Sequence, residues 1–161
     1  MLVHHPIDPL FDCSSSVLIL GSFPSVKSRE QVFFYGHPQN RFWKLIACLF
    51  EAPFPETIEE RKQLILNSHL ALWDVIASCD IEGSSDSSIR NVVPNDLDVI
   101  LAHAPIGRIY LNGRTAEKYY RKYTQPLIQR EAVVLPSTSP ANAAWSFERL
   151  CEAWRVILAD A

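Results

Sequence analysis

"SVLILGS", residues 16–22, is a short apolar run that ends in Gly and Ser. Residues 17–20 leave no polar face, and such a run is typical of a strand buried on both sides in a parallel sheet. Because buried parallel strands belong to α/β proteins, this stretch indicates the fold class. The residues that follow, "GSFPS" at 21–25, predict a loop at the carboxyl end of the strand.

Further strands and helices alternate along the chain around this first strand. Strands are expected at 70–76, at 108–113 and from 132 onwards, and a loop is expected at 82–91. Helices are expected at 38–50, 57–68, 95–104, 115–123 and 146–158. In the first of these helices Pro38 suits the opening turn, which would place Asn40 in that turn as well. The alternation predicts an α/β fold with a mostly parallel sheet, in one domain spanning 1–161.

The composition is that of a globular protein, with 161 residues of which 48% are hydrophobic and 20% charged. The formal net charge of −3 argues against a protein that coats nucleic acid without specificity. Basic residues gather between 108 and 130, where a solvated helix face is expected. The apolar runs are too short to cross a bilayer and no signal peptide is visible, so a cytoplasmic location is expected. The four scattered cysteines are expected to be reduced.

Several common catalytic motifs are missing. The sequence lacks G-x-x-x-x-G-K-[ST], G-x-G-x-x-G and G-x-S-x-G, so it gives no motif support to phosphate-binding-loop, dinucleotide or serine hydrolase chemistry. Its five histidines form no pattern of metal ligands, and His4 and His5 are expected to be tail residues. The unusual stretch is "FFYGHPQNRFW" at 33–43, where aromatic rings flank a polar segment. Such rings can stack on a nucleobase, and amides can read the edge of the base.

Three motifs in order, "GSFPS" at 21–25, "FYGHPQNRFW" at 34–43 and "LPSTSPAN" at 135–142, resemble those of the uracil-DNA glycosylase superfamily. Together they are most similar to the hypoxanthine-DNA glycosylases, also called DNA-deoxyinosine glycosylases. The resemblance implies a three-layer α/β/α fold with a central, mostly parallel four-stranded sheet. It also implies base excision repair, in which the enzyme hydrolyses the N-glycosidic bond of a deaminated base, most of all hypoxanthine, flipped out of DNA. No cofactor, metal or membrane would be needed, and a monomer near the nucleoid would suffice.

The resemblance also assigns roles to residues. Mismatch-specific relatives place a catalytic Asn where this chain has Phe23, and in the hypoxanthine branch that role passes to the position of Asn40. Asn40 is therefore expected to position water and to stabilise the cationic sugar, since the motif loops offer no carboxylate in a matching position. The residues expected to bind the base are Gly21, Ser22, Phe23, Tyr35 and Asn112. Those expected to bind DNA are Pro24, Ser25, Ser137, Ser139, Pro140, Ala141 and Asn142.

Within these sets some roles are more specific, and others stay open. Tyr35 is expected to stack on the base, and Asn142 is expected to fill the gap that the flipped nucleotide leaves. Arg41 is expected either to form an ion pair or to contact a phosphate, whereas Phe42 and Trp43 are expected to pack the helix. Two other functions are left open, namely a mismatch-specific uracil- or thymine-DNA glycosylase, and a non-catalytic protein that binds damaged DNA or a nucleotide.

Overall fold

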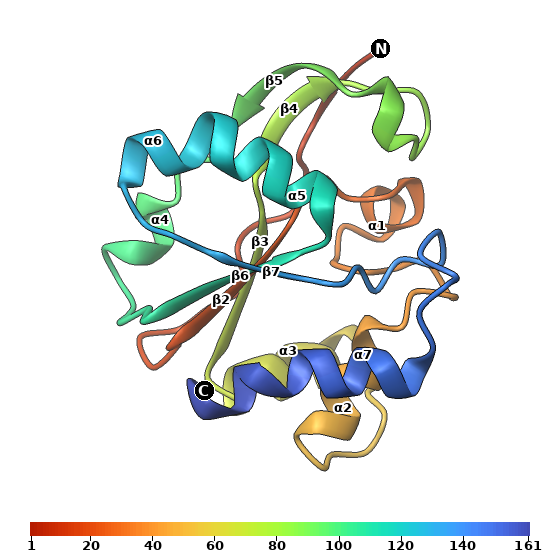
Figure 1. Ribbon diagram of the computed structural model, residues 1–161, viewed down its shortest axis with the longest axis vertical. Coiled ribbons are helices and arrows are strands. Elements are labelled where there is room, and N and C mark those ends of the chain that lie inside the picture. Colours follow the sequence, from red (N-terminus) through yellow and green to blue (C-terminus); the bar gives the residue numbers. More distant parts are fainter.

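A four-stranded parallel sheet forms the middle layer of the computed structural model, which describes residues 1–161 (Figure 1). The strand order is β3-β2-β6-β7, and each neighbouring pair is parallel. The strands are β2 (Val17–Gly21), β3 (Leu70–Asp74), β6 (Arg108–Asn112) and β7 (Val133–Leu135). Every residue of β2 and β3 is buried, which explains why both strands are apolar apart from Asp74 at the end of β3. The predicted α/β class and the predicted four-stranded sheet are confirmed.

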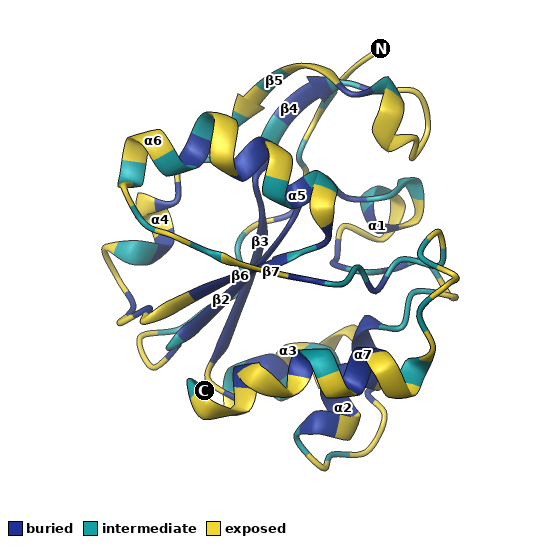
Figure 2. Cartoon of the chain, in the orientation of Figure 1, coloured by how far each residue is buried: buried dark blue, intermediate teal, exposed yellow.

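Helices cover both faces of this sheet and complete the three layers. One face carries α5 (Arg114–Tyr119) and α6 (Gln125–Ile128), which a π-helical segment at Tyr120–Thr124 joins into one rod. The other face carries α2 (Phe42–Leu49), α3 (Ile58–Asn67) and α7 (Phe147–Trp154), followed by a 3₁₀ turn at Arg155–Ala159 (Figure 1). Figure 2 shows most of the strands in the blue of buried residues, whereas the helices expose yellow outer faces.

Local sequence explains where two of the covering helices begin. Thr57 precedes α3 and its hydroxyl oxygen accepts from the backbone N–H of Glu60 at 3.0 Å. Ser146 precedes α7 and accepts from Arg149 N–H at 3.2 Å. Each side chain satisfies an N–H group that a helix start leaves without a partner. From these starts, α3 contributes Ile65 and α7 contributes Leu150 and Trp154 to a core of 37 buried residues.

A second, antiparallel sheet lies beside the first and corrects the predicted strands. It consists of β1 (Leu2–His4), β4 (Ile76–Asp80) and β5 (Arg90–Pro94), in the order β1-β4-β5. The strand expected at 70–76 therefore ends at Asp74, and the chain enters a different sheet from Ile76. The segment expected as a loop at 82–91 holds only a 3₁₀ turn (Asp86–Ser88) before β5 begins. These strands lack a clear apolar alternation because the adjacent residues Ser78 and Cys79 of β4 are both buried and β5 is largely exposed.

The start of α2 also differs from the prediction. The helix begins at Phe42, and residues 37–40 form a turn in which Asn40 N–H donates to His37 O at 3.0 Å. The side chain of Asn40 accepts from Phe42 N–H at 2.9 Å. Such a side-chain bond competes with helix formation, so the helix starts after Asn40 rather than at Pro38.

Two shorter helices complete the fold. One is α1 (Val26–Gln31), which was not predicted, and the other is α4 (Asp98–Leu101), which occupies only part of the expected helix at 95–104. None of the helices combines the length and apolar character that spanning a membrane requires.

Candidate active site

A cavity of about 880 Å³ opens at the carboxyl ends of the parallel strands. The chain passes from β2 to β3 on one side and returns to β6 on the other, so strand order reverses at β2. Ligands of α/β proteins bind at such a reversal, beyond the strand ends. Every residue predicted to catalyse or to bind lines this one cavity: Asn40, Gly21, Ser22, Phe23, Tyr35, Asn112, Pro24, Ser25, Ser137, Ser139, Pro140, Ala141 and Asn142.

Tyr35 lies in the cavity wall with one face of its ring covered. It stacks on Phe42 with a centroid distance of 4.0 Å, so a base could stack only on the opposite face. Phe42 and Trp43 are buried, which confirms that they pack the helix. The Tyr35 hydroxyl has no hydrogen-bond partner. Burial raises the pKa of this hydroxyl above its usual range, and the charge of Asp74 raises it further, so the hydroxyl keeps its proton as a donor.

Asn40 is half-buried and presents a fixed amide to the cavity. The bond that Oδ1 accepts from Phe42 N–H sets which end of the amide is the oxygen. A carbonyl oxygen has two lone pairs, so Oδ1 keeps a second acceptor position for water. The amide nitrogen makes no hydrogen bond within the chain, so both ends of this side chain can act on a ligand.

The loop "GSFPS" supplies backbone donors to the cavity. The N–H groups of Ser22 and Phe23 make no hydrogen bond within the chain. The ring of Phe23 is held by Arg29, whose guanidinium lies 5.6 Å from the ring centroid and donates to Pro24 O at 2.9 Å. Ser25 caps α1 by accepting from Ser28 N–H at 3.2 Å, and it also donates to the Ser28 hydroxyl. A phosphate contact by Ser25 would therefore compete with the bond that its hydroxyl donates to Ser28 Oγ, and the cap could remain.

Asn112 holds the third motif in place. Its Oδ1 accepts from Thr138 N–H and its Nδ2 donates to Thr138 Oγ1, both at 3.0 Å. The second N–H of the amide lies near the Tyr35 hydroxyl, so a ligand would share it with that hydroxyl. The next residue, Gly113, has φ +100° and approaches Ser137 closely, so a side chain at this position would be strained. The turn at Asn112 and Gly113 is therefore also the place where the end of β6 contacts the loop at 136–145.

The loop at 136–145 uses its polar side chains mostly on itself. Ser137 Oγ accepts from Ser139 N–H at 3.1 Å, and Ser139 Oγ accepts from Ala141 N–H at 3.2 Å. Each hydroxyl proton is left free to donate outwards. The amide of Asn142 points back into the loop and donates to Ser137 O at 3.0 Å. Ala141 is exposed at the tip, so Asn142 must release Ser137 before it can enter a duplex.

Arg41 fastens this loop to the turn that carries Asn40. Its guanidinium donates to Ser139 O at 3.2 Å, to Asn142 O at 3.0 Å and to Trp145 O. Its backbone N–H donates to Thr138 O at 3.1 Å. The side chain of Arg41 was expected to form an ion pair or to contact a phosphate. In the structure it instead binds three backbone carbonyls of the loop.

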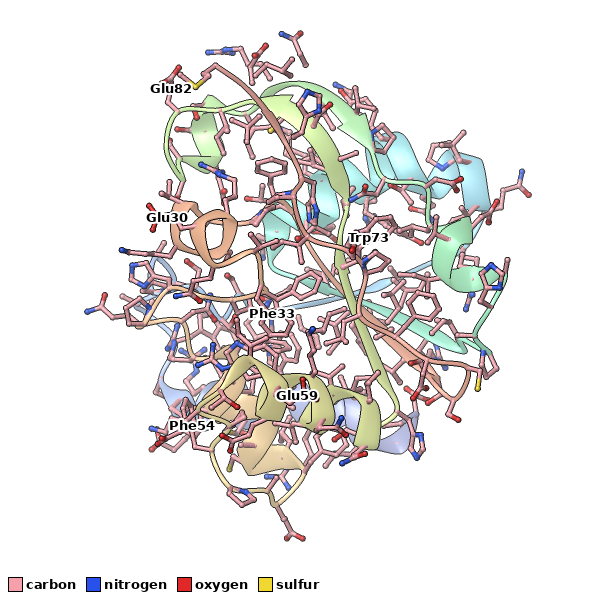
Figure 3. The ribbon with its side chains drawn as sticks, turned by 180° about the vertical axis from the view of Figure 1, so that it is seen from behind. Glu30, Phe33, Phe54, Glu59, Trp73 and Glu82 are labelled. Atoms are coloured by element: carbon pink, nitrogen blue, oxygen red, sulfur yellow. The ribbon has the colours of Figure 1, made fainter.

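Asp74, which is outside the sets of residues predicted for the site, also lines the cavity, and His5 pairs with it from outside the lining. Asp74 ends β3, one residue after Trp73, which Figure 3 labels in the interior of the protein. Its Oδ2 lies 2.7 Å from Nε2 of His5, and both side chains are buried. His5 is therefore not a tail residue. The ring of His5 packs edge-on against Phe23, with 6.0 Å between the ring centroids. The His5–Asp74 pair is therefore in contact with the motif "GSFPS".

The expected solvated helix face is present between 108 and 130. Arg114, Lys118, Arg121 and Lys122 are exposed, and Arg121 pairs with Glu117 at 3.0 Å. Arg114 is the member of this group that lines the cavity. Of these four basic side chains, three therefore lie on the helix surface outside the cavity.

Comparison with known proteins agrees with this geometry. The family model described as Uracil DNA glycosylase superfamily matches residues 9–159. A protein of Methanosarcina acetivorans named Hypoxanthine DNA glycosylase is 34% identical over 153 residues, which cover 92% of this chain and 93% of that protein. A protein of the same name from Methanosarcina barkeri strain Fusaro is 29% identical over 139 residues, which cover 83% of this chain and 85% of that protein.

A solved structure adds the comparison of folds. It is a solution NMR structure from Methanosarcina acetivorans, provisionally described as a uracil DNA glycosylase, with a TM-score of 0.82 and 31% sequence identity. The match covers 98% of this chain and 97% of that one. The family match spans nearly the whole chain, and the residues of all three motifs meet in one cavity. The chain therefore belongs to the uracil DNA glycosylase superfamily.

Proposed function

We propose that the chain is a monofunctional DNA glycosylase that releases hypoxanthine flipped out of DNA and leaves an abasic site. The observation that carries this proposal is the meeting of three groups in one cavity. These are the fixed amide of Asn40, the open ring face of Tyr35 and the unpartnered N–H groups of Ser22 and Phe23. The relatives named Hypoxanthine DNA glycosylase support the choice of base.

In the proposed mechanism, the glycosidic bond breaks before water attacks. Its electron pair moves to the base, and positive charge develops on the sugar. The free lone pair of Asn40 Oδ1 would stabilise this charge and hold the water whose oxygen then bonds to C1′. The N–H groups of Ser22 and Phe23 would stabilise the negative charge on the departing base, which finally takes up a proton. Because water attacks the sugar and amide groups stabilise both charges, this mechanism needs no carboxylate nucleophile.

The remaining motif residues would hold the DNA. The free hydroxyl protons of Ser137 and Ser139 suit phosphate oxygens, which position a duplex without reading its sequence. Gly21 would shape the site for the base, and Pro24 would shape the surface along which the DNA strand lies. Asn112 would offer its second N–H to the base. We propose that residues 1–161 act as one domain and as a monomer, in the cytoplasm, on the DNA of the nucleoid.

The loop tip would offset the cost of extruding the base. Extrusion costs a few kcal/mol, and least for a base that is already mispaired or single-stranded. We expect Asn142→Gly to slow excision from a stable pair more than from a mismatch or a single strand. Single-turnover rates on the three substrates measure this, with Ala143→Gly as a control for added backbone flexibility in the same loop. Equal slowing on all three substrates would mean that Asn142 is not a wedge.

One assay tests the function itself. The protein is incubated with duplexes that contain hypoxanthine, uracil or xanthine, and abasic sites are revealed as alkali-labile breaks. We expect breaks at hypoxanthine, at an equal rate with and without a chelator, because the proposed chemistry uses only amide and backbone groups. Faster cleavage at mismatched uracil would favour the mismatch-specific alternative. Binding to the lesion without any break would favour the non-catalytic alternative.

A further inference from the structure

Asp74 presents one unpaired carboxylate oxygen at the base of the cavity. Its side chain is 6% exposed and that of His5 is 3% exposed. Oδ2 is paired with His5, whereas Oδ1 receives no hydrogen bond within the chain. A Cβ on Gly21 would collide with this Oδ1, and it would also lie 3.4 Å from the Tyr35 hydroxyl. Glycine at 21 thus leaves the space in which these two polar groups converge.

The hydrogen bonds of His5 fix which of its nitrogens carries the proton. Nδ1 accepts from the backbone N–H of Ile7 at 3.2 Å, so this nitrogen has no proton. The proton therefore lies on Nε2, which donates to Asp74 Oδ2 at 2.7 Å. The ring is further held edge-on between Phe23 and Trp73. His5 thus occupies one carboxylate oxygen and leaves the other as a single acceptor.

Unpartnered donors line the same cavity as this acceptor. The N–H groups of Ser22 and Phe23 lie just beyond the end of β2, and Gly21 pairs with Asp74 across the sheet. Ser22 and Phe23 are half-buried, so a ligand in the cavity can reach N–H groups that the chain itself does not use. One acceptor oxygen beside free N–H donors matches the edge of a base that carries one N–H next to a carbonyl.

Deamination creates such an edge. It replaces an exocyclic amino group by a carbonyl and places a proton on the adjacent ring nitrogen, as in the change from adenine to hypoxanthine. We propose that Asp74 reads this edge, with Oδ1 accepting the new ring N–H while the amides of Ser22 and Phe23 donate to the new carbonyl oxygen. This assignment rests on the proposed function and names the residue that selects its substrate. His5 is a positioning residue in this scheme.

The same arrangement disfavours the normal purines. Adenine would place the lone pair of its ring nitrogen against the carboxylate and its amino group against N–H donors. Guanine carries the ring N–H, but its additional amino group would need a second acceptor, and His5 already occupies Oδ2. Uracil carries the same pair of groups as hypoxanthine, so the size of the cavity, and not Asp74, would separate purines from pyrimidines.

Binding to uncleavable oligonucleotides tests this proposal apart from catalysis. Single strands that carry 2′-fluoro nucleosides of hypoxanthine, adenine or guanine avoid both base cleavage and the energy of flipping. We expect the wild type to prefer hypoxanthine over adenine roughly 10- to 100-fold, the discrimination of a good base-edge contact. In Asp74→Asn the amide oxygen would face His5 and the amino group would face the base, so this preference should disappear. Asp160→Asn, a carboxylate change outside the cavity, should keep it.

A second variant covers the case in which Asp74→Asn does not fold. His5→Phe keeps a ring between Phe23 and Trp73 but frees Oδ2 as a second acceptor. We expect guanine to gain binding relative to hypoxanthine in this variant, whereas a merely structural role would weaken both bases alike. If Asp74→Asn keeps the preference for hypoxanthine, or loses only the excision rate, Asp74 does not read the base. If the wild type shows the preference but cuts no hypoxanthine, the reading stands and the glycosylase proposal fails.

Discussion

Asn40→Ala is expected to slow excision of hypoxanthine at least about a hundredfold, the loss seen when one preorganised electrostatic group is removed. The reason is that Oδ1 would stabilise the cationic sugar and hold the water, and alanine offers neither contact. The fold should persist, because the substitution removes a single bond to Phe42 N–H. Losing such a helix-start contact costs about 1 kcal/mol. Single-turnover excision and thermal unfolding measure the two effects.

A matched variant separates the two roles of this side chain. Serine can accept from Phe42 N–H but has no amide, so Asn40→Ser should recover most of the lost stability and little of the lost rate. If both variants cut at nearly the normal rate, the catalytic group lies elsewhere in the cavity, and Asp74 becomes the first residue to examine. If both lose rate and stability together, the turn at 37–40 is structural.

The parallel sheet could be predicted from the sequence because burial on both faces leaves an unmistakable pattern. The strands at 17–21 and 70–74 consist almost wholly of apolar residues. The antiparallel sheet could not be predicted, since β5 is mostly exposed and β1 has three residues only. The start of α2 was misplaced because the bond from Asn40 to Phe42 N–H depends on a turn that the spacing of apolar residues does not reveal.

The site was predictable where a residue lies in a motif and not where it acts through tertiary contacts. His5 and Asp74 are 69 residues apart. Their pairing follows from the N-terminal segment, which pairs antiparallel with β4 and bridges β3 at Leu10. One signal was available, since Asp74 is the last residue of a buried strand, at the carboxyl end where ligands bind. The partners of Arg41 left no signal, because its acceptors are backbone carbonyls and every residue has one.

Arg41→Ala is expected to release the loop at 136–145 and to slow excision from a stable base pair by roughly 10- to 100-fold. That range corresponds to the few kcal/mol that flipping a paired base requires. Three carbonyls lose their donor, and each bond from a charged group contributes about 1.5–3 kcal/mol. Because the freed carbonyls can bind water, we expect a stability loss of about 3 kcal/mol rather than the full sum.

The distinguishing result for Arg41 is the dependence on substrate. Single-strand excision should fall much less than duplex excision, because Asn40 still has its bond to Phe42 N–H and the base needs no flipping. Arg41→Lys should be intermediate, since an ammonium group keeps the charge but cannot span three carbonyls. Arg130→Ala is the matched control, because Arg130 also donates to a carbonyl, Ile106 O at 2.8 Å, and does not line the cavity. If Arg41→Ala leaves duplex excision and stability unchanged, the bonds between Asn112 and Thr138 hold the loop by themselves.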